Sequence, residues 1–246
     1  MSRKLTITLF YTGIALLSAL ILTIAWILRP GLTESYDPPI VVETGKVTEM
    51  EWFEISNDLE GVNQEGEEVS LFDLRGKVWL IGQFFAVCPH CAVRNGTEMR
   101  AIYDEFRDHP DFHVVCITVD PDEDDVEKLG DYASALGAET HNWWFINAGD
   151  MEATHEYLED ELNFMAIRER TDPLDIQANG RFSHDLGLMV VNRDLKVIGK
   201  WPLASARDPE NEARDPGGYE RLKAEILDRI RAELDGDGDA MAEVEG

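Results

Sequence analysis

Residues 78–85 form the most constraining stretch of the sequence, because they are almost continuously apolar (Val-Trp-Leu-Ile-Gly-Gln-Phe-Phe). A run of this length without polar alternation is typical of a strand that is buried on both faces. Such a strand needs other elements to cover each side of its sheet. The stretch therefore predicts the centre of a covered sheet, and it ends shortly before the pair Cys88 and Cys91.

Apolar periodicity along the following residues predicts alternating helices and strands. Met99, Ile102 and Phe106 are spaced three and four residues apart, as on one face of a helix, and the acidic run 120–125 suits the start of another helix. We also expect strands at 112–119 and 143–146, a helix at 126–136, a hairpin of 188–191 with 197–201, and a last helix over 219–230. This order predicts an α/β fold with a mixed central sheet flanked by helices.

Cys88 and Cys91 are predicted to be a redox-active pair. Two cysteines separated by two residues, at the end of a strand and opening a helix, are typical of a thioredoxin-like fold. The N-terminus of that helix stabilises the thiolate of Cys88, and a protonated His90 lowers its pKa further. Cys116 lies inside the predicted strand 112–119, so we expect it to be a buried and inert thiol.

His184 is the histidine whose position suggests a site. It lies directly before the predicted strand 188–191, and in a thioredoxin-like sheet the loop entering that strand faces the cysteine pair. Cys88, Cys91 and His184 would together offer two thiolates and one imidazole, a set of ligands suited to copper, and the thiolates favour Cu(I). The alternative is a histidine of a surface loop, and the pattern alone leaves both interpretations open.

The N-terminal segment predicts a single-pass membrane anchor. Residues 5–28 contain no charged residue and are long enough to cross a hydrocarbon core of about 30 Å as a helix. A cleaved signal peptide is the alternative, but the apolar stretch exceeds the usual h-region and no Ala-x-Ala site follows Trp26. Arg3 and Lys4 precede the span, so the positive-inside rule places the remaining chain on the extracytoplasmic side of the cell membrane.

These patterns divide the chain into four parts. Residues 1–29 are the predicted transmembrane anchor, and residues 30–48, which are rich in Pro and Gly, form a linker. Residues 49–233 are the predicted thioredoxin-like domain, in which 159–181 match no simple element and are interpreted as a long surface insertion. Residues 234–246 are acidic and Gly-rich, which predicts a disordered tail.

The charge of the chain excludes some classes of partner. With 49 acidic against 22 basic residues, the formal net charge is −27. Nucleic acid and anionic lipid surfaces would be repelled, so we expect neither as a ligand. Two interpretations remain, namely a solvated acidic surface that keeps the protein soluble, and electrostatic attraction of cations or of a basic partner.

The region 50–232 resembles the Sco/SenC family. The likeness rests on residues 71–78 (Leu-Phe-Asp-Leu-Arg-Gly-Lys-Val), the cysteine turn, residues 116–121 (Cys-Ile-Thr-Val-Asp-Pro) and the sequence Phe-Ser-His at 182–184. Members of this family are membrane-tethered copper proteins of the thioredoxin fold that take part in the assembly of cytochrome c oxidase. The resemblance implies that Cys88, Cys91 and His184 bind copper and that the protein partner is a copper-containing oxidase subunit.

One departure from the family keeps two functions open. Sco proteins usually have three residues between their cysteines, whereas two separate Cys88 from Cys91 here. The first hypothesis is copper delivery, or cysteine reduction, during oxidase assembly. The second is a thiol-disulfide oxidoreductase without copper, in which Cys88 attacks a substrate disulfide and Cys91 resolves the mixed disulfide. His184 distinguishes them, because copper binding needs this side chain and exchange chemistry does not.

Overall fold

The computed structural model describes residues 12, 17–19, 23, 53–87 and 92–236. The elements of the first part are β1 (Phe53–Glu54), β2 (Glu60–Val62), β3 (Glu68–Ser70), η2 (Leu71–Leu74), β4 (Val78–Phe84), η3 (Ala92–Gly96), α2 (Thr97–Phe106), β5 (Phe112–Thr118), α3 (Val126–Leu136) and β6 (Trp143–Ile146). They continue with α4 (Met151–Glu156), η4 (Tyr157–Glu161), β7 (Arg168–Glu169), α5 (Pro173–Asn179), β8 (Phe182–Ser183), β9 (Leu188–Val191), β10 (Lys196–Trp201), α6 (Leu203–Ala206), α7 (Pro209–Arg214) and α8 (Gly218–Asp235).

The main sheet of the described residues has six strands in the order β1-β10-β9-β4-β5-β6. Strands β4, β5 and β6 are parallel, whereas β9 runs antiparallel to β4 and β10 antiparallel to β9. Every residue of β4 is buried, because it is an inner strand covered on both faces. The predicted central strand and the predicted mixed α/β sheet are confirmed.

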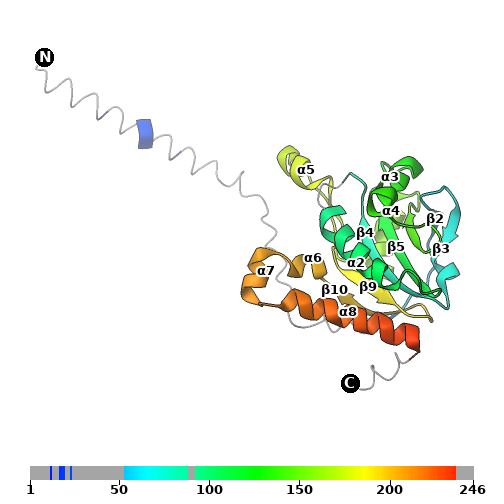
Figure 1. Cartoon of the computed structure of the whole chain (residues 1–246). Helices are drawn as coiled ribbons and strands as arrows, with labels where there is room; N and C mark the ends of the chain where they lie inside the picture. The colour runs from blue at the N-terminus through cyan, green and yellow to red at the C-terminus, as the bar shows by residue number, and fades with distance from the viewer. Residues whose placement is uncertain (1–11, 13–16, 20–22, 24–52, 88–91, 237–246) are drawn as a thin grey trace, which may run out of the picture. The chain divides into compact units, whose positions relative to one another are not determined.

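Two apolar layers cover the sheet. On one face, β4 and β5 pack against side chains of α2, α3 and α8, among them Ile102, Leu129 and Ile226. On the other face, the layer comes from η2 and from the segment that follows α4, including Leu74 and Leu158. Figure 1 shows α8 lying along the sheet beside α2. Alternate residues of each strand supply the two layers, as the pleat of a strand requires.

The predicted helices and the hairpin are also observed. The acidic run 120–125 does lead into α3, where the Asp125 carboxylate caps the helix by accepting a hydrogen bond from Lys128 N at 2.9 Å. The hairpin of β9 and β10 turns at Asn192, whose side chain accepts hydrogen bonds from the backbone N–H groups of Asp194 and Lys196. Local hydrogen-bonding side chains thus set both of these connections.

The prediction of a surface insertion at 159–181 was partly wrong. Leu162 and Phe164 are buried in the core, with 0% and 5% of their surface exposed. Further along, β7 pairs antiparallel with β8, and α5, which buries none of its residues, projects from the body in Figure 1. The backbone around Asn163 is irregular, with a φ of 52°, so the buried side chains show neither helical nor strand periodicity in the sequence.

Both ends of the chain extend past the described residues. No helix among the residues that the structure describes is long and apolar enough to cross a membrane. The predicted span 5–28 lies almost entirely outside them, as does the linker, so the anchor stays a prediction. At the other end, α8 continues to Asp235 with Leu234 buried, so the first two residues of the predicted tail belong to the helix.

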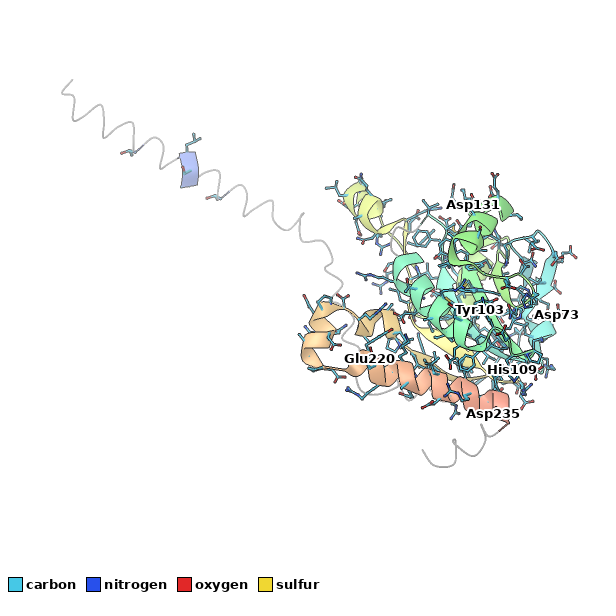
Figure 2. The ribbon with its side chains drawn as sticks, viewed as in Figure 1. Asp73, Tyr103, His109, Asp131, Glu220 and Asp235 are labelled. Atoms are coloured by element: carbon cyan, nitrogen blue, oxygen red, sulfur yellow. The ribbon has the colours of Figure 1, made fainter. Side chains whose placement is uncertain are left out.

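Acidic side chains are spread over the outside of the domain. Figure 2 shows Asp73, Asp131, Glu220 and Asp235, which are exposed and come from η2, α3 and the two ends of α8. Such a distribution keeps like charges in water, where repulsion between them is weak. It fits the interpretation of the charge as a solvated acidic surface.

Candidate functional site

The described residues frame the cysteine turn on both sides. Strand β4 ends at Phe84 and leads through Val87, which is 65% exposed, towards the turn. The chain resumes as η3 and continues directly into α2. Cys88 and Cys91 themselves lie outside the described residues. The expected strand before them and the expected helix after them are therefore present, and the role of the two thiols stays a prediction.

His184 lies at the end of the sheet where β4 leads into the cysteine turn. Strand β9 is antiparallel to β4, with Ile81 opposite Met189, so residues that precede β9 run alongside residues that follow β4. The imidazole of His184 contacts the ring of Phe85 edge-on, with 5.6 Å between the ring centroids. His184 is half-buried. Of the two interpretations left open by the sequence, this position disfavours an ordinary surface loop.

The tautomer of His184 follows from its hydrogen bond. Nδ1 lies 2.9 Å from the carbonyl oxygen of Asp185. A carbonyl oxygen only accepts, so Nδ1 carries the proton and Nε2 bears the lone pair. Burial lowers the pKa of His184 to about 4. The ring is therefore neutral at pH 7, which is the form in which histidine binds metals.

Asp185 and Gln83 are polar residues of this region that the sequence analysis missed. The Gln83 side chain is buried in β4, and its Oε1 accepts a hydrogen bond from Asp185 N at 3.1 Å. The buried Asp185 carboxylate accepts from Met165 N at 3.0 Å and from Gly187 N at 2.7 Å, and it pairs with Lys200. One signal was visible in the sequence, namely a glutamine inside an otherwise apolar strand.

A second buried carboxylate lies beside the residues that follow β4. Asp124 is fully buried, and its Oδ2 accepts a hydrogen bond from Ala86 N at 3.0 Å and another from the hydroxyl of Thr118. Burial raises the pKa of Asp124. Nearby, Asp120 pairs with Arg181 at 3.1 Å. The acidic run therefore does more than start a helix, because Asp124 holds the backbone two residues before Cys88.

Cys116 is the buried and inert thiol that the sequence predicts. Its exposed fraction is 1%, and its Sγ accepts a hydrogen bond from Trp143 Nε1 at 3.3 Å. Burial raises its pKa to about 12, so the thiolate is scarce at neutral pH. Cys116 therefore takes no part in thiol chemistry of the folded protein.

A metal centre made only of described residues is absent. Among residues 53–87 and 92–236, no group of three His, Cys, Asp or Glu side chains is placed to hold a metal ion. The predicted trio combines His184 with Cys88 and Cys91, and the two cysteines lie beyond the described part. The prediction that His184 and the two sulfur atoms together form one site thus stays a prediction.

The mixed sheet, the helix after the cysteine turn and the hairpin that follows His184 define a thioredoxin-like domain. The family model described as SCO1/SenC matches residues 47–215, which is more than half of the chain. The chain therefore belongs to the SCO1/SenC family.

Individual relatives agree with this assignment. The SCO1 protein homolog of Bacillus subtilis (strain 168) is 25% identical over 137 residues, which cover 55% of this chain and 67% of the relative. Among solved structures, a SCO1/SenC family lipoprotein from Bacillus anthracis str. Ames has a TM-score of 0.56 at 20% identity, covering 71% of this chain and 94% of that one. Arabidopsis thaliana ScoI with copper bound has a TM-score of 0.52 at 14% identity, covering 72% and 98%. At such identities the structural likeness establishes the fold alone.

Proposed function

We propose that this chain is a membrane-anchored Sco-like protein that binds copper through Cys88, Cys91 and His184. Its role is copper delivery or cysteine reduction during the assembly of cytochrome c oxidase, with a copper-containing oxidase subunit as its partner. The observation that carries the proposal is the position of the His184 ring against Phe85, at the sheet end that leads into the cysteine turn. Copper-bound structures of two family relatives, from Arabidopsis thaliana and Bradyrhizobium japonicum, support the choice of metal.

The chemistry of the donor set fits copper. Thiolate sulfur favours Cu(I), and imidazole nitrogen also suits Cu(II), so two cysteines and one histidine can hold either oxidation state. His184 needs no deprotonation to act as a ligand, because its ring is neutral and Nδ1 already carries the proton. The two cysteines must be reduced and must lose their protons, so copper binding competes with formation of a disulfide. In this role copper is cargo that is passed to the partner.

The predicted anchor suits such a role. A single span at residues 5–28 would keep the domain on the extracytoplasmic side of the cell membrane, where a membrane-embedded partner exposes its own metal site. The linker 30–48 would give the domain freedom to reach that partner.

A thiol-disulfide oxidoreductase is the second candidate function. The observation that favours it is the two-residue spacing of Cys88 and Cys91. The thiolate of Cys88 would attack a substrate disulfide, and Cys91 would then displace the substrate thiolate. The substrate disulfide becomes two thiols while Cys88 and Cys91 form a disulfide, so two electrons pass to the substrate. A relative with a solved structure, BsSco, is a member of the Sco family in which a disulfide switch was identified.

An anaerobic copper titration of the reduced full-length chain in detergent tests the proposal. We expect one Cu(I) per chain, and we expect His184→Ala to lose Cu(II) retention more than Cu(I) binding, since two thiolates still hold Cu(I). His141→Ala is the matched control, because His141 is exposed on another loop. Equal binding of copper by His184→Ala and the wild type would refute the copper site and favour the oxidoreductase.

A further inference from the structure

Asp185 connects four separate parts of the fold. Its backbone N–H donates to Gln83 on β4, and its carboxylate accepts from the N–H groups of Met165 and Gly187. The same carboxylate pairs with Lys200 on β10. Only 4% of Asp185 is exposed, so these bonds are made away from water. The residue is therefore held from several directions at once.

The backbone of Asp185 in turn holds His184. The Asp185 carbonyl oxygen is the acceptor for His184 Nδ1, at 2.9 Å. Any rotation of the peptide plane that follows Asp185 would remove this acceptor and with it the preference for one tautomer. The bond from the Asp185 N–H group to Gln83 fixes the chain before that carbonyl, and the bond from Gly187 N to the Asp185 carboxylate fixes the chain after it, so together they oppose such a rotation.

Lys200 completes the arrangement from the next strand. Its side chain is 15% exposed, and its ammonium lies 5.2 Å from the ring centroid of Phe164, where a cation is attracted by the aromatic face. A buried ion pair adds little net stability, because desolvation of both charges offsets their attraction. Its better-attested effect is to favour one conformation over others. Phe164 and Met165 belong to the segment 159–181, which thus supports the histidine loop.

Gly187 shows how closely the ion pair fills this space. A Cβ atom added at position 187 would lie 2.5 Å from Cε of Lys200 and 3.0 Å from Oδ1 of Asp185. Both distances are shorter than ordinary van der Waals contact, so any larger residue would displace the pair. Gly187→Ala therefore disturbs the same arrangement without removing either charge.

We propose that Asp185, paired with Lys200, is a positioning residue that holds the His184 ring in its Nδ1–H tautomer and so presents Nε2 as a metal ligand. This inference rests on the proposed role of His184 in copper binding. Groups that accept a hydrogen bond from a metal-binding histidine typically change metal affinity about 10- to 100-fold when they are lost.

The test uses the full-length chain in detergent with four variants. Asp185→Asn and Lys200→Met remove one charge each, Gly187→Ala displaces the pair, and Arg193→Met is the matched control. Arg193 pairs with Asp111 at 2.8 Å, and its guanidinium also donates to Gly76 O, before the first residue of β4 and thus at the opposite end of that strand. The first measurement is ¹⁵N NMR of the copper-free protein at pH 7, with the His184 resonance assigned by its absence in His184→Ala. The second is Cu(I) and Cu(II) affinity by competition with a chelator.

We expect a single Nδ1–H tautomer for His184 in the wild type and in Arg193→Met. The other three variants should show a mixture of tautomers and a fall in copper affinity of about 10- to 100-fold. A single Nδ1–H tautomer in all three would overturn the positioning role, even if their stability were reduced. The tautomer is measured without copper, so it tests the positioning role alone. The proposed function is tested separately, and it fails if His184→Ala binds copper like the wild type.

Discussion

Strand β5 and the loop before β9 each carry a histidine, and the two histidines lie in different surroundings. Strand β5 contains His113 and Cys116, each 1% exposed. His184 contacts the ring of Phe85, the residue directly after β4. On β5, Cys116 belongs to the apolar core, whereas the His184 loop is crossed by hydrogen bonds and an ion pair. The same residue type therefore lies in an apolar environment on β5 and in a polar one before β9.

The two histidines show what makes this difference. Burial lowers the pKa of His113 to about 3 and that of His184 to about 4, so both rings are neutral at pH 7. His113 packs edge-on against Trp144, and its Nε2 has no hydrogen-bond partner among the described residues. His184 instead has its tautomer set by the Asp185 carbonyl. Burial alone keeps an imidazole neutral, whereas a hydrogen-bond partner also fixes its tautomer and the direction of its ring.

The largest expected contrast is between the thiols of Cys88 and Cys116. We expect Cys88 to be alkylated well below the ordinary thiol pKa of about 8.5, because a helix N-terminus stabilises its thiolate. Cys116, with its pKa raised to about 12, should react roughly a thousandfold more slowly in the folded chain. Alkylation rates against pH, followed by peptide mass spectrometry, measure both. Equal rates for the two thiols would show that Cys88 is no more reactive than Cys116 and would contradict this prediction.

The Asp124 carboxylate offers a test of the chain segment that directly follows β4. Asp124→Ala would leave the Ala86 N–H and the Thr118 hydroxyl without their acceptor in a buried place. We expect a loss of about 1–3 kcal/mol in the free energy of unfolding, measured by urea denaturation. Asp125→Ala removes only the α3 cap and should cost about 1 kcal/mol. A cost for Asp124→Ala below that of Asp125→Ala would contradict this role.

The smallest expected effect is the acid sensitivity caused by His113. Its folded-state pKa of about 3 lies below the unfolded value near 6.5, so between these values the unfolded chain binds a proton that the folded chain does not. Stability should fall as the pH drops below about 6.5, by about 1 kcal/mol between pH 7 and pH 5.5. His113→Leu should remove this part of the pH dependence, as seen in urea denaturation at both pH values. An unchanged pH dependence would show that His113 accepts the proton in the folded state.

Much of the fold could be predicted because its elements have local signatures. The apolar run of β4, the periodicity of α2 and α8, and the turn of the β9–β10 hairpin each follow from a few neighbouring residues. The segment 159–181 could not be predicted in this way, because Leu162 and Phe164 enter the core from an irregular backbone. Only their contacts with distant residues explain their burial.

The sequence by itself determined the α/β order, the inert character of Cys116 and the choice of His184 as a candidate ligand. These conclusions depend on apolar patterns and on the position of a residue relative to a strand. The tertiary structure decided which groups hold His184, since Gln83 and Asp185 are 102 positions apart and Asp185 and Lys200 are 15 apart. The physical reason is that hydrogen bonds and ion pairs form between atoms that the topology brings together, and no pattern of neighbouring residues contains that information.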